Sequence, residues 1–473
     1  MPMNAAAQLD HTAAPHISQR CGIEPESRRD PGFSGPSVLA QATWHSLAWL
    51  VVANLIGVWL AILLLYPQAG AWIAPWSYGR WMPVHMNLEL YGWIAMPLVG
   101  WLFRVYRAED PTLAPWSRIA LLLWSLALTL GSVSWLNGHS SGKLFLDWSG
   151  YVRIFFPVCI LFLWIVLVTA FVCDRRSAMP SSTAARIAKA LGLVLLLLVP
   201  FTIYLACNPA IYPPVNPSSG GPTAASQLES VLIIVLILFL LPYGITKRGK
   251  GSARWLKAGW IVFALECLLY IGMGHGNLSD HRPTQYLALG SLLVWVPLMP
   301  AYYGAFLWRQ NTKRWRIAVF AWWALLIPSG WLLFLPGVLD RLKFTDGLVG
   351  HSILAMAGFV TALLIFILIA LLDDDGDAFR STWSFYAWNF GAFLYVVLFA
   401  YAGWIEGRDP AFTMVPGPLR DAIYAVRLIL GIAMTAASID WFVRLTLRIR
   451  ARTAAAPSHA AQAHAAFTGV ATR

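Results

Sequence analysis

The sequence predicts an all-α, polytopic membrane protein with about 12 transmembrane helices, and three observations support this fold class. Hydrophobic residues make up 58% of the 473-residue chain and charged residues only 12%, whereas soluble domains carry about 25% charged residues. Apolar runs recur along most of the chain, each long enough for the roughly 20 residues that a membrane helix needs. The turn-rich and charged segments between these runs are short. These features exclude an ordinary soluble enzyme, a disordered chain and a collagen-like chain.

The apolar runs define a membrane domain at residues 43–448, with a tail at each end (1–42 and 449–473). We expect both tails to be mobile and cytoplasmic, because neither contains an apolar run that could be tied into the bundle. The twelve expected spans lie near residues 43–66, 84–105, 115–135, 149–173, 186–207, 223–243, 255–274, 285–308, 316–338, 347–372, 383–405 and 421–446.

Lys and Arg are distributed unevenly between the two sides of this predicted topology. The tails and alternate loops carry 25 of them, and the opposite loops carry 9. Because cytoplasmic loops of membrane proteins are enriched in Lys and Arg, both termini are expected in the cytoplasm. The formal charge of +12 then follows from topology, and no nucleic-acid partner is expected. One loop, DDDGD (373–377), is acidic on the side that should be basic.

Three histidines fall at a similar expected depth, near the outer ends of three different spans. They are His85, His275 and His351. Neutral imidazole is the commonest metal ligand in proteins, and ionisable groups inside a membrane usually mark functional sites. The alternative for each histidine is a hydrogen bond to a neighbouring helix. The arrangement predicts a cofactor site in the outer third of the membrane.

Glu89 follows His85 by four residues, so the two side chains should share one helix face with Gly92 and Met96. The Glu89 carboxylate could orient the imidazole or take part in proton movement. On the face of His351, Gly358 leaves room either for a neighbouring helix or for a flat macrocycle.

The five cysteines are scattered, and the chain contains no C-x-x-C or C-x-x-C-H motif. Neither a zinc knuckle nor covalent haem attachment of the c type is therefore encoded.

Four segments resemble subunit I of the haem–copper oxidase superfamily, with the C-type cytochrome oxidases and nitric oxide reductases nearest. They are HMNLELYGW (85–93), GMGHGNLSDHRPTQYLALGS (272–291), GLVGHSILAMAGF (347–359) and YAVRLILGIAMTA (424–436). The resemblance covers about residues 43–448 and implies a subunit I-like helical bundle.

The resemblance also implies roles for individual residues. It makes His85 an axial ligand of one haem, His351 the ligand of a second, five-coordinate haem, and Arg427 a partner of the haem propionates. His275 corresponds to a copper ligand, and Tyr270 lies near the family's active-site tyrosine.

The chain departs from the family pattern at three positions that should hold histidines. These positions are occupied by Pro222, Gly276 and Ile353. We therefore expect haem but no copper, with non-haem iron on mixed His and Glu ligands as an alternative.

The sequence thus predicts a cytochrome c oxidase subunit I-like haem protein of respiratory electron transfer. We expect it in a bacterial-type cytoplasmic membrane, in contact with lipid and with other respiratory subunits or a cytochrome. Reduction of oxygen or nitric oxide stays open, with Glu89 and Tyr270 as the catalytic candidates. The alternatives are a non-catalytic scaffold paralogue and a twelve-span secondary transporter.

Overall fold

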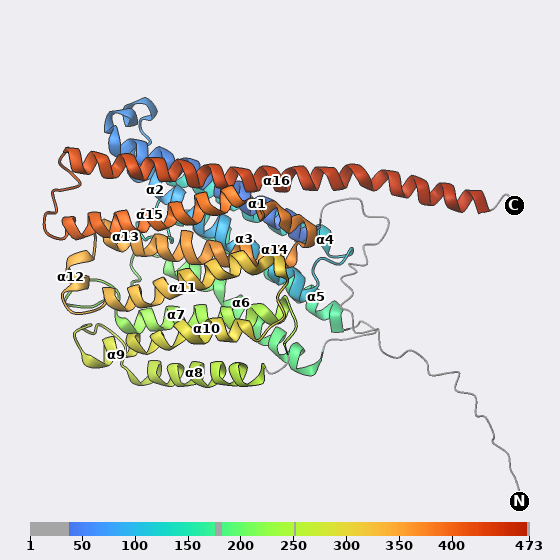
Figure 1. Cartoon of the computed structure of the whole chain (residues 1–473), viewed down its shortest axis with the longest axis horizontal. Helices are drawn as coiled ribbons and strands as arrows, with labels where there is room; N and C mark the ends of the chain where they lie inside the picture. The colour runs from blue at the N-terminus through green and yellow to red at the C-terminus, as the bar shows by residue number, and fades with distance from the viewer. Residues whose placement is uncertain (1–36, 176–181, 250–251, 471–473) are drawn as a thin grey trace, which may run out of the picture. The chain divides into compact units, whose positions relative to one another are not determined.

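The computed structural model describes residues 37–175, 182–249 and 252–470. Most of the expected N-terminal tail lies outside these ranges. Within them the chain is helical and forms no β-strand, which confirms the all-α class. Figure 1 shows the long helices running side by side.

The first half of the bundle contains α1 (Val38–Leu65), a 3-10 turn (Pro67–Ile73), α2 (Tyr78–Asn87), the π-helix η2 (Leu88–Ile94), α3 (Ala95–Tyr106), α4 (Ala114–Leu136), α5 (Val152–Arg175) and α6 (Thr183–Ala206).

The second half contains α7 (Ala224–Leu240), η3 (Leu241–Gly244), α8 (Ala253–Gly272), α9 (Pro283–Ser291), η4 (Leu292–Val294), α10 (Trp295–Gly304), η5 (Gln310–Thr312), α11 (Lys313–Leu333), α12 (Val338–Leu342), α13 (Asp346–Ile353), the π-helix η6 (Leu354–Val360), α14 (Thr361–Leu371), η7 (Asp373–Phe379), α15 (Thr382–Glu406) and α16 (Pro418–Val470). The compact membrane unit ends at Ala454, inside α16.

Eleven helices among the described residues are long and apolar enough to cross a membrane, so the fold is that of a polytopic membrane protein. The twelfth expected span, 84–105, is helical over Tyr78–Tyr106 but is not one of the eleven. Its polar residues His85, Asn87 and Glu89 make it less apolar than the other spans.

Several spans begin at a Ser or Thr whose side-chain oxygen accepts a hydrogen bond from the first turn. These caps precede α1, α6, α7, α13 and α15 and are Ser37, Ser182, Thr223, Thr345 and Ser381. Such a cap satisfies a backbone N–H that the helix itself leaves unpaired, at a point where the chain enters an apolar region.

The π-helices η2 and η6 are joined by one buried hydroxyl group. The Thr361 hydroxyl accepts a hydrogen bond from Trp93 Nε1 in η2, at 2.9 Å, and donates one to the Met356 carbonyl oxygen in η6, at 3.0 Å. Each π-helix also holds a glycine against a tryptophan. A Cβ at Gly92 would lie 2.5 Å from Trp49, and one at Gly358 would lie 2.6 Å from Trp322. Single π turns occur often at functional sites.

The first and last spans lie side by side. Trp44 near the start of α1 donates from Nε1 to Thr446 Oγ1 near the middle of α16, at 3.0 Å. The start of α1 and the part of α16 around Thr446 therefore lie at the same level of the bundle. α1 also contributes residues to both large hydrophobic clusters, one formed mainly by α1 to α6 and the other by α1 and α7 to α16.

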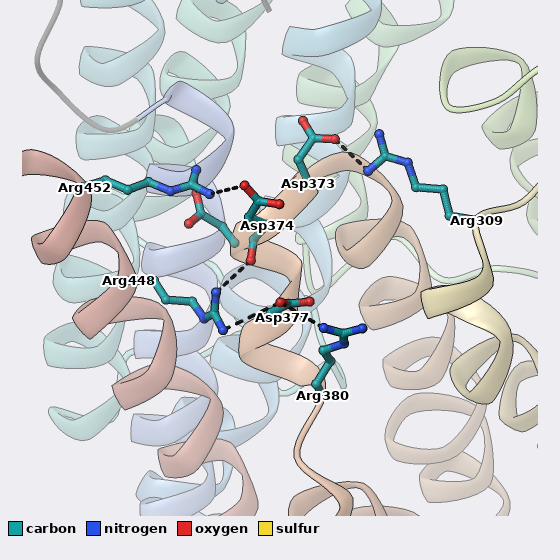
Figure 2. Close-up of polar contacts among 8 residues, drawn as sticks. Arg309, Asp373, Asp374, Asp377, Arg380, Arg448 and Arg452 are labelled. Carbon is teal, nitrogen blue, oxygen red and sulfur yellow. Dashed lines mark hydrogen bonds and ion pairs between the residues drawn. The ribbon is translucent and has the colours of Figure 1, made fainter. Parts of the chain in front are cut away.

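The acidic run 373–377 is neutralised by arginines from three other parts of the chain (Figure 2). The ion pairs join Arg309 to Asp373 at 2.7 Å, Arg452 to Asp375 at 2.8 Å and to Asp374 at 3.4 Å, Arg380 to Asp377 at 3.1 Å, and Arg448 to Asp377 at 3.8 Å. Two of these arginines, Arg448 and Arg452, lie on α16. Their ion pairs therefore attach α16 to the acidic segment that follows α14. This accounts for the exception in the charge distribution.

Candidate functional site

A cavity of about 190 Å³ lies among α1, α2, η2, α13, η6, α15 and α16. Three of the predicted site residues line it, namely His85, Glu89 and Arg427. They come from segments more than 300 residues apart along the chain, so the fold itself brings them together. Most of the remaining lining is apolar.

The His85 imidazole is held in one defined tautomer. Its Nδ1 lies 2.8 Å from the carbonyl oxygen of Ala53 on α1. A carbonyl oxygen only accepts hydrogen bonds, so Nδ1 carries the proton and the neutral ring presents its lone pair at Nε2. Histidine ligands of metals are usually oriented in this way by a carbonyl group. The lack of a side chain at Gly57 makes room for the ring itself, since a Cβ there would lie 2.9 Å from Cε1.

Glu89 lies one turn deeper than His85, in the π-helix η2. It lines the same cavity and makes no hydrogen bond or ion pair with any of the residues that the structure describes. A half-buried carboxyl group without a partner is costly inside a membrane and usually has a function.

Arg427 on α16 lies at the same cavity and has an exposed side-chain fraction of only 14%. Its Nε donates to Tyr395 Oη at 3.0 Å, and its Nη1 lies 3.8 Å from Asp346 Oδ2. The long distance to Asp346 leaves the guanidinium group able to accept a second anion. Arg427, Tyr78 and Tyr395 together form the polar wall of the cavity.

His351 lies on the other face of α13 and does not line the cavity. Its Nδ1 is 3.2 Å from Ser329 Oγ on α11, and this hydroxyl donates its hydrogen to the Leu326 carbonyl oxygen at 3.0 Å. The hydroxyl therefore accepts from Nδ1–H, and Nε2 of His351 is also left as the lone-pair nitrogen. A Cβ at Gly330 would lie 3.5 Å from this Nε2. The two imidazoles thus share a hydrogen-bonded Nδ1 and an adjacent glycine, although they lie in separate places.

His275 and Tyr270 are close to each other but away from the cavity. Their rings make an edge contact with centroids 4.6 Å apart, and Tyr270 Oη donates to Glu229 Oε2 at 3.1 Å. His275 and Glu229 are exposed on the surface of the bundle. In the part of the chain that the structure describes, no three His, Cys, Asp or Glu side chains group closely enough to hold a metal ion.

The expected stripe of small and sulfur-containing residues behind His85 is interrupted. Glu89 shares the cavity with His85, but Gly92 packs against Trp49 and Met96 is fully buried elsewhere. The π-helix Leu88–Ile94 widens the turn after Asn87, so the spacing of the later side chains departs from that of a regular α-helix. The space at Gly358, which could have received a macrocycle, is likewise filled by Trp322.

Residues that the sequence analysis did not single out complete the cavity. Four methionines line it, at positions 82, 86, 356 and 434. Met82 precedes His85 by three residues and Met356 follows Ile353 by three, so helical spacing could have indicated these two. Met434 could be found only from the packing of α16.

Phe145 closes one side of the cavity from the loop between α4 and α5. The loop is held by η2 and α2, since Tyr91 Oη donates to the Phe145 carbonyl oxygen at 2.8 Å and Asn87 Nδ2 donates to Asp147 Oδ2 at 2.9 Å. Burial raises the pKa of the Asp147 carboxyl group, although the hydrogen bonds from Asn87 and Ser140 act in the opposite direction.

No protein-family model matches the chain. The chain is similar to a cytochrome c oxidase subunit 1 homolog of Azorhizobium caulinodans, with 21% identity over 465 residues. The alignment covers 89% of this chain and 84% of that protein. Fold and similarity together define an oxidase-like, multi-pass membrane protein. Because the similarity extends over nearly the full length of both chains, it supports a relationship to the haem–copper oxidases.

Proposed function

We propose that this chain is a membrane haem protein of respiratory electron transfer, built on a fold like that of cytochrome c oxidase subunit I. The observation that carries the proposal is the cavity at which His85, Glu89 and Arg427 meet. Its donor set suits a haem: an imidazole with a free Nε2, a cation with two tyrosines at one wall, and mainly apolar side chains around them.

In this proposal His85 holds the iron of one haem through Nε2, and the Ala53 carbonyl oxygen fixes the ring. Arg427 and Tyr78 bind the propionates, because both line the polar wall. The haem supplies one-electron redox chemistry when it is bound. The apolar lining keeps water from the site and so favours rapid exchange of electrons without side reactions.

His351 is proposed to hold a second haem, next to α11. Its support is the hydrogen bond at Nδ1, which as at His85 leaves Nε2 as the lone-pair nitrogen, with a glycine, here Gly330, next to the ring. A haem at each histidine would give the membrane two redox centres on opposite faces of α13.

Glu89 is proposed as a proton-carrying group beside the first haem. Its carboxyl group lines the same cavity as His85 and lacks a partner among the residues described. Taking up a proton there would compensate the charge of an electron entering a buried site. We assign no reduction of oxygen or nitric oxide, since Pro222, Gly276 and Ile353 stand where the family has histidines. Tyr270, with His275 and Glu229, stays a candidate outside this site.

The helices contact the lipid bilayer, and some of them offer apolar faces for other subunits as well. In the most apolar stretches of α6 and α8, only 11% and 17% of the residues are buried inside the bundle. We propose that respiratory partner subunits or a cytochrome cover part of these faces, in a bacterial cytoplasmic membrane.

The test is the haem content and Soret spectrum of the purified chain, expressed in haem-replete cells. We expect about two haems per chain, with one lost in His85→Ala and one in His351→Ala. His45→Ala is the matched control, because His45 is another half-buried histidine in a span but bonds only to Ser125 away from the cavity. Absence of any Soret band would leave the scaffold and transporter alternatives.

A further inference from the structure

The cavity around His85 is rich in thioether sulfur. Of the 11 methionines in the chain, four line this one space, at positions 82, 86, 356 and 434. Methionine fills irregular apolar space, but its sulfur also binds haem iron opposite a histidine. The resemblance implies a second histidine ligand at position 353. This chain has Ile353 there, and its side chain has no atom able to bind a metal.

Two of the four methionines belong to the helix that carries His85. Met82 and Met86 lie within one turn of it on α2, so they are on the same side of any ligand that His85 holds. A second axial ligand must come from the opposite wall, which leaves Met356 and Met434.

The Met434 side chain is held by its packing against α15. Its side chain is 8% exposed and lies against Gly391, where a Cβ would be 3.0 Å from Met434 Cγ. Met356 is less buried, and it lies in η6, one turn beyond Ile353. Side chains of a helix lean toward its N-terminus, so the Met356 side chain covers the turn that contains Ile353.

The backbone at Met356 is also fixed. Its carbonyl oxygen accepts the hydrogen bond from Thr361 Oγ1, and the same hydroxyl is bound by Trp93 of η2. η2 is the continuation of the helix that carries His85. The two walls of the cavity are therefore held in register by a buried hydrogen-bonded link that ends at Met356 itself.

We infer that Met356 supplies the second axial ligand, through its sulfur, to the haem that His85 holds. The inference rests on the proposed haem function. It makes the first haem a six-coordinate, non-covalently bound centre with one imidazole and one thioether ligand. Such a ligand pair gives a higher reduction potential than two imidazoles, because a thioether is a softer and weaker electron donor than imidazole and so favours the reduced iron.

The test uses the full-length chain purified in detergent, measured by optical spectroscopy, near-infrared magnetic circular dichroism and redox titration. In the native protein we expect a low-spin centre with a sulfur-to-iron charge-transfer band. Met356→Leu keeps the side-chain volume and should abolish this band, converting the centre to a high-spin form that binds carbon monoxide. Met96→Leu, on α3 and fully buried outside the cavity, is the matched control and should keep the band.

A gain-of-ligand variant separates loss of the ligand from loss of folding. Ile353→His in the Met356→Leu background should restore a low-spin spectrum without the charge-transfer band and with a lower reduction potential than the native centre. A band that survives Met356→Leu, or that is lost in Met434→Leu instead, would overturn the assignment to Met356. A haem that lacks the band in the native protein would overturn thioether ligation while leaving the haem proposal intact. A chain without any Soret band would instead refute the proposed function.

Discussion

His85 Cε1 lies so close to Gly57 that a Cβ placed on this glycine would be 2.9 Å from it. Real Cβ atoms do not approach carbon that closely, so the imidazole occupies space that only glycine provides. One turn earlier on the same helix, the Ala53 carbonyl oxygen binds Nδ1 of the ring. The backbone of α1 therefore sets both the tautomer and the position of the proposed ligand.

Gly57→Ala should push the His85 ring away from its position and lower the haem content at least severalfold. The overpacking should also cost about 1–3 kcal/mol of stability. The measurement is the Soret absorbance per chain after purification. Gly79→Ala on α2 is the control, since its new methyl group would meet nothing within 4 Å. Equal haem content in the two variants would contradict the close packing of His85 on α1.

Thr361→Val should loosen the link between the two π-helices. Valine keeps the shape but removes the hydroxyl, which leaves Trp93 Nε1 and the Met356 carbonyl oxygen without this partner. We expect a loss of about 1–3 kcal/mol, measured as a lower midpoint of denaturant-induced unfolding. Thr446→Val is the comparison, because Thr446 also links a tryptophan to a backbone carbonyl oxygen but is less buried. If the two variants lose the same stability, the greater burial of the Thr361 hydroxyl does not increase its contribution to stability, and this account is wrong.

Arg452→Gln should weaken the attachment of α16 to the acidic run 373–377. The side chain of Asp375 is 7% exposed, and its ion pair with Arg452 at 2.8 Å belongs to a network of several charges. A loss of about 1 kcal/mol is expected, and it should shrink at high salt. Arg444→Gln removes a more exposed pair with Asp440 and should cost less. Thermal unfolding in low and high salt measures both, and a larger effect at Arg444 would contradict this account.

Asp147→Asn should change how stability depends on pH. Burial raises the pKa of this carboxyl group, so the native protein keeps a proton that the unfolded chain releases near pH 4. The native state gains this stability fully below the unfolded value and loses it as the pH rises through the raised native pKa. Raising the pH from about 4.5 to about 7.5 should therefore destabilise the native protein relative to the variant. Parallel pH profiles of the unfolding midpoint would rule this out.

The distribution of basic residues predicts the membrane orientation, and labelling can test this prediction. Arg314→Cys should react with an impermeant thiol reagent only from the cytoplasmic side, and Lys143→Cys only from the outside. The cysteines of the native chain must first be replaced, because Cys173 is exposed. Labelling of Lys143→Cys from the cytoplasm would reverse the orientation and the depth assigned to His85.

The parts of this fold that depend on local pattern could be predicted from the sequence. The apolar runs identify the spans, and four-residue spacing places Glu89 on the face of His85. The π-helix at Leu88–Ile94 has no comparable signal, since its extra residue is stabilised by packing on Trp49 and by the link to Thr361. Gly92 and Met96, which lie in or beyond it, do not line the cavity with Glu89.

The remaining wall of the site depends on contacts between distant spans. Nothing near Met434 in the sequence indicates that it faces His85, and nothing near Asp375 indicates that Arg452 neutralises it. His351 shows the opposite case. Its helix was predicted, but its two-residue offset from Ile353 turns it toward α11 and away from the cavity, as helical geometry requires.

The pairing of Trp44 with Thr446 has a consequence for the order of events during synthesis. The wall that holds Arg427 and Met434 belongs to α16, which is synthesised more than 300 residues after the wall on α1 that holds Gly57. The cavity is therefore incomplete until almost the entire polypeptide has been inserted. On the proposed function, a haem delivered earlier would meet His85 without its opposite wall, so haem loading would be a late step that follows insertion of α16.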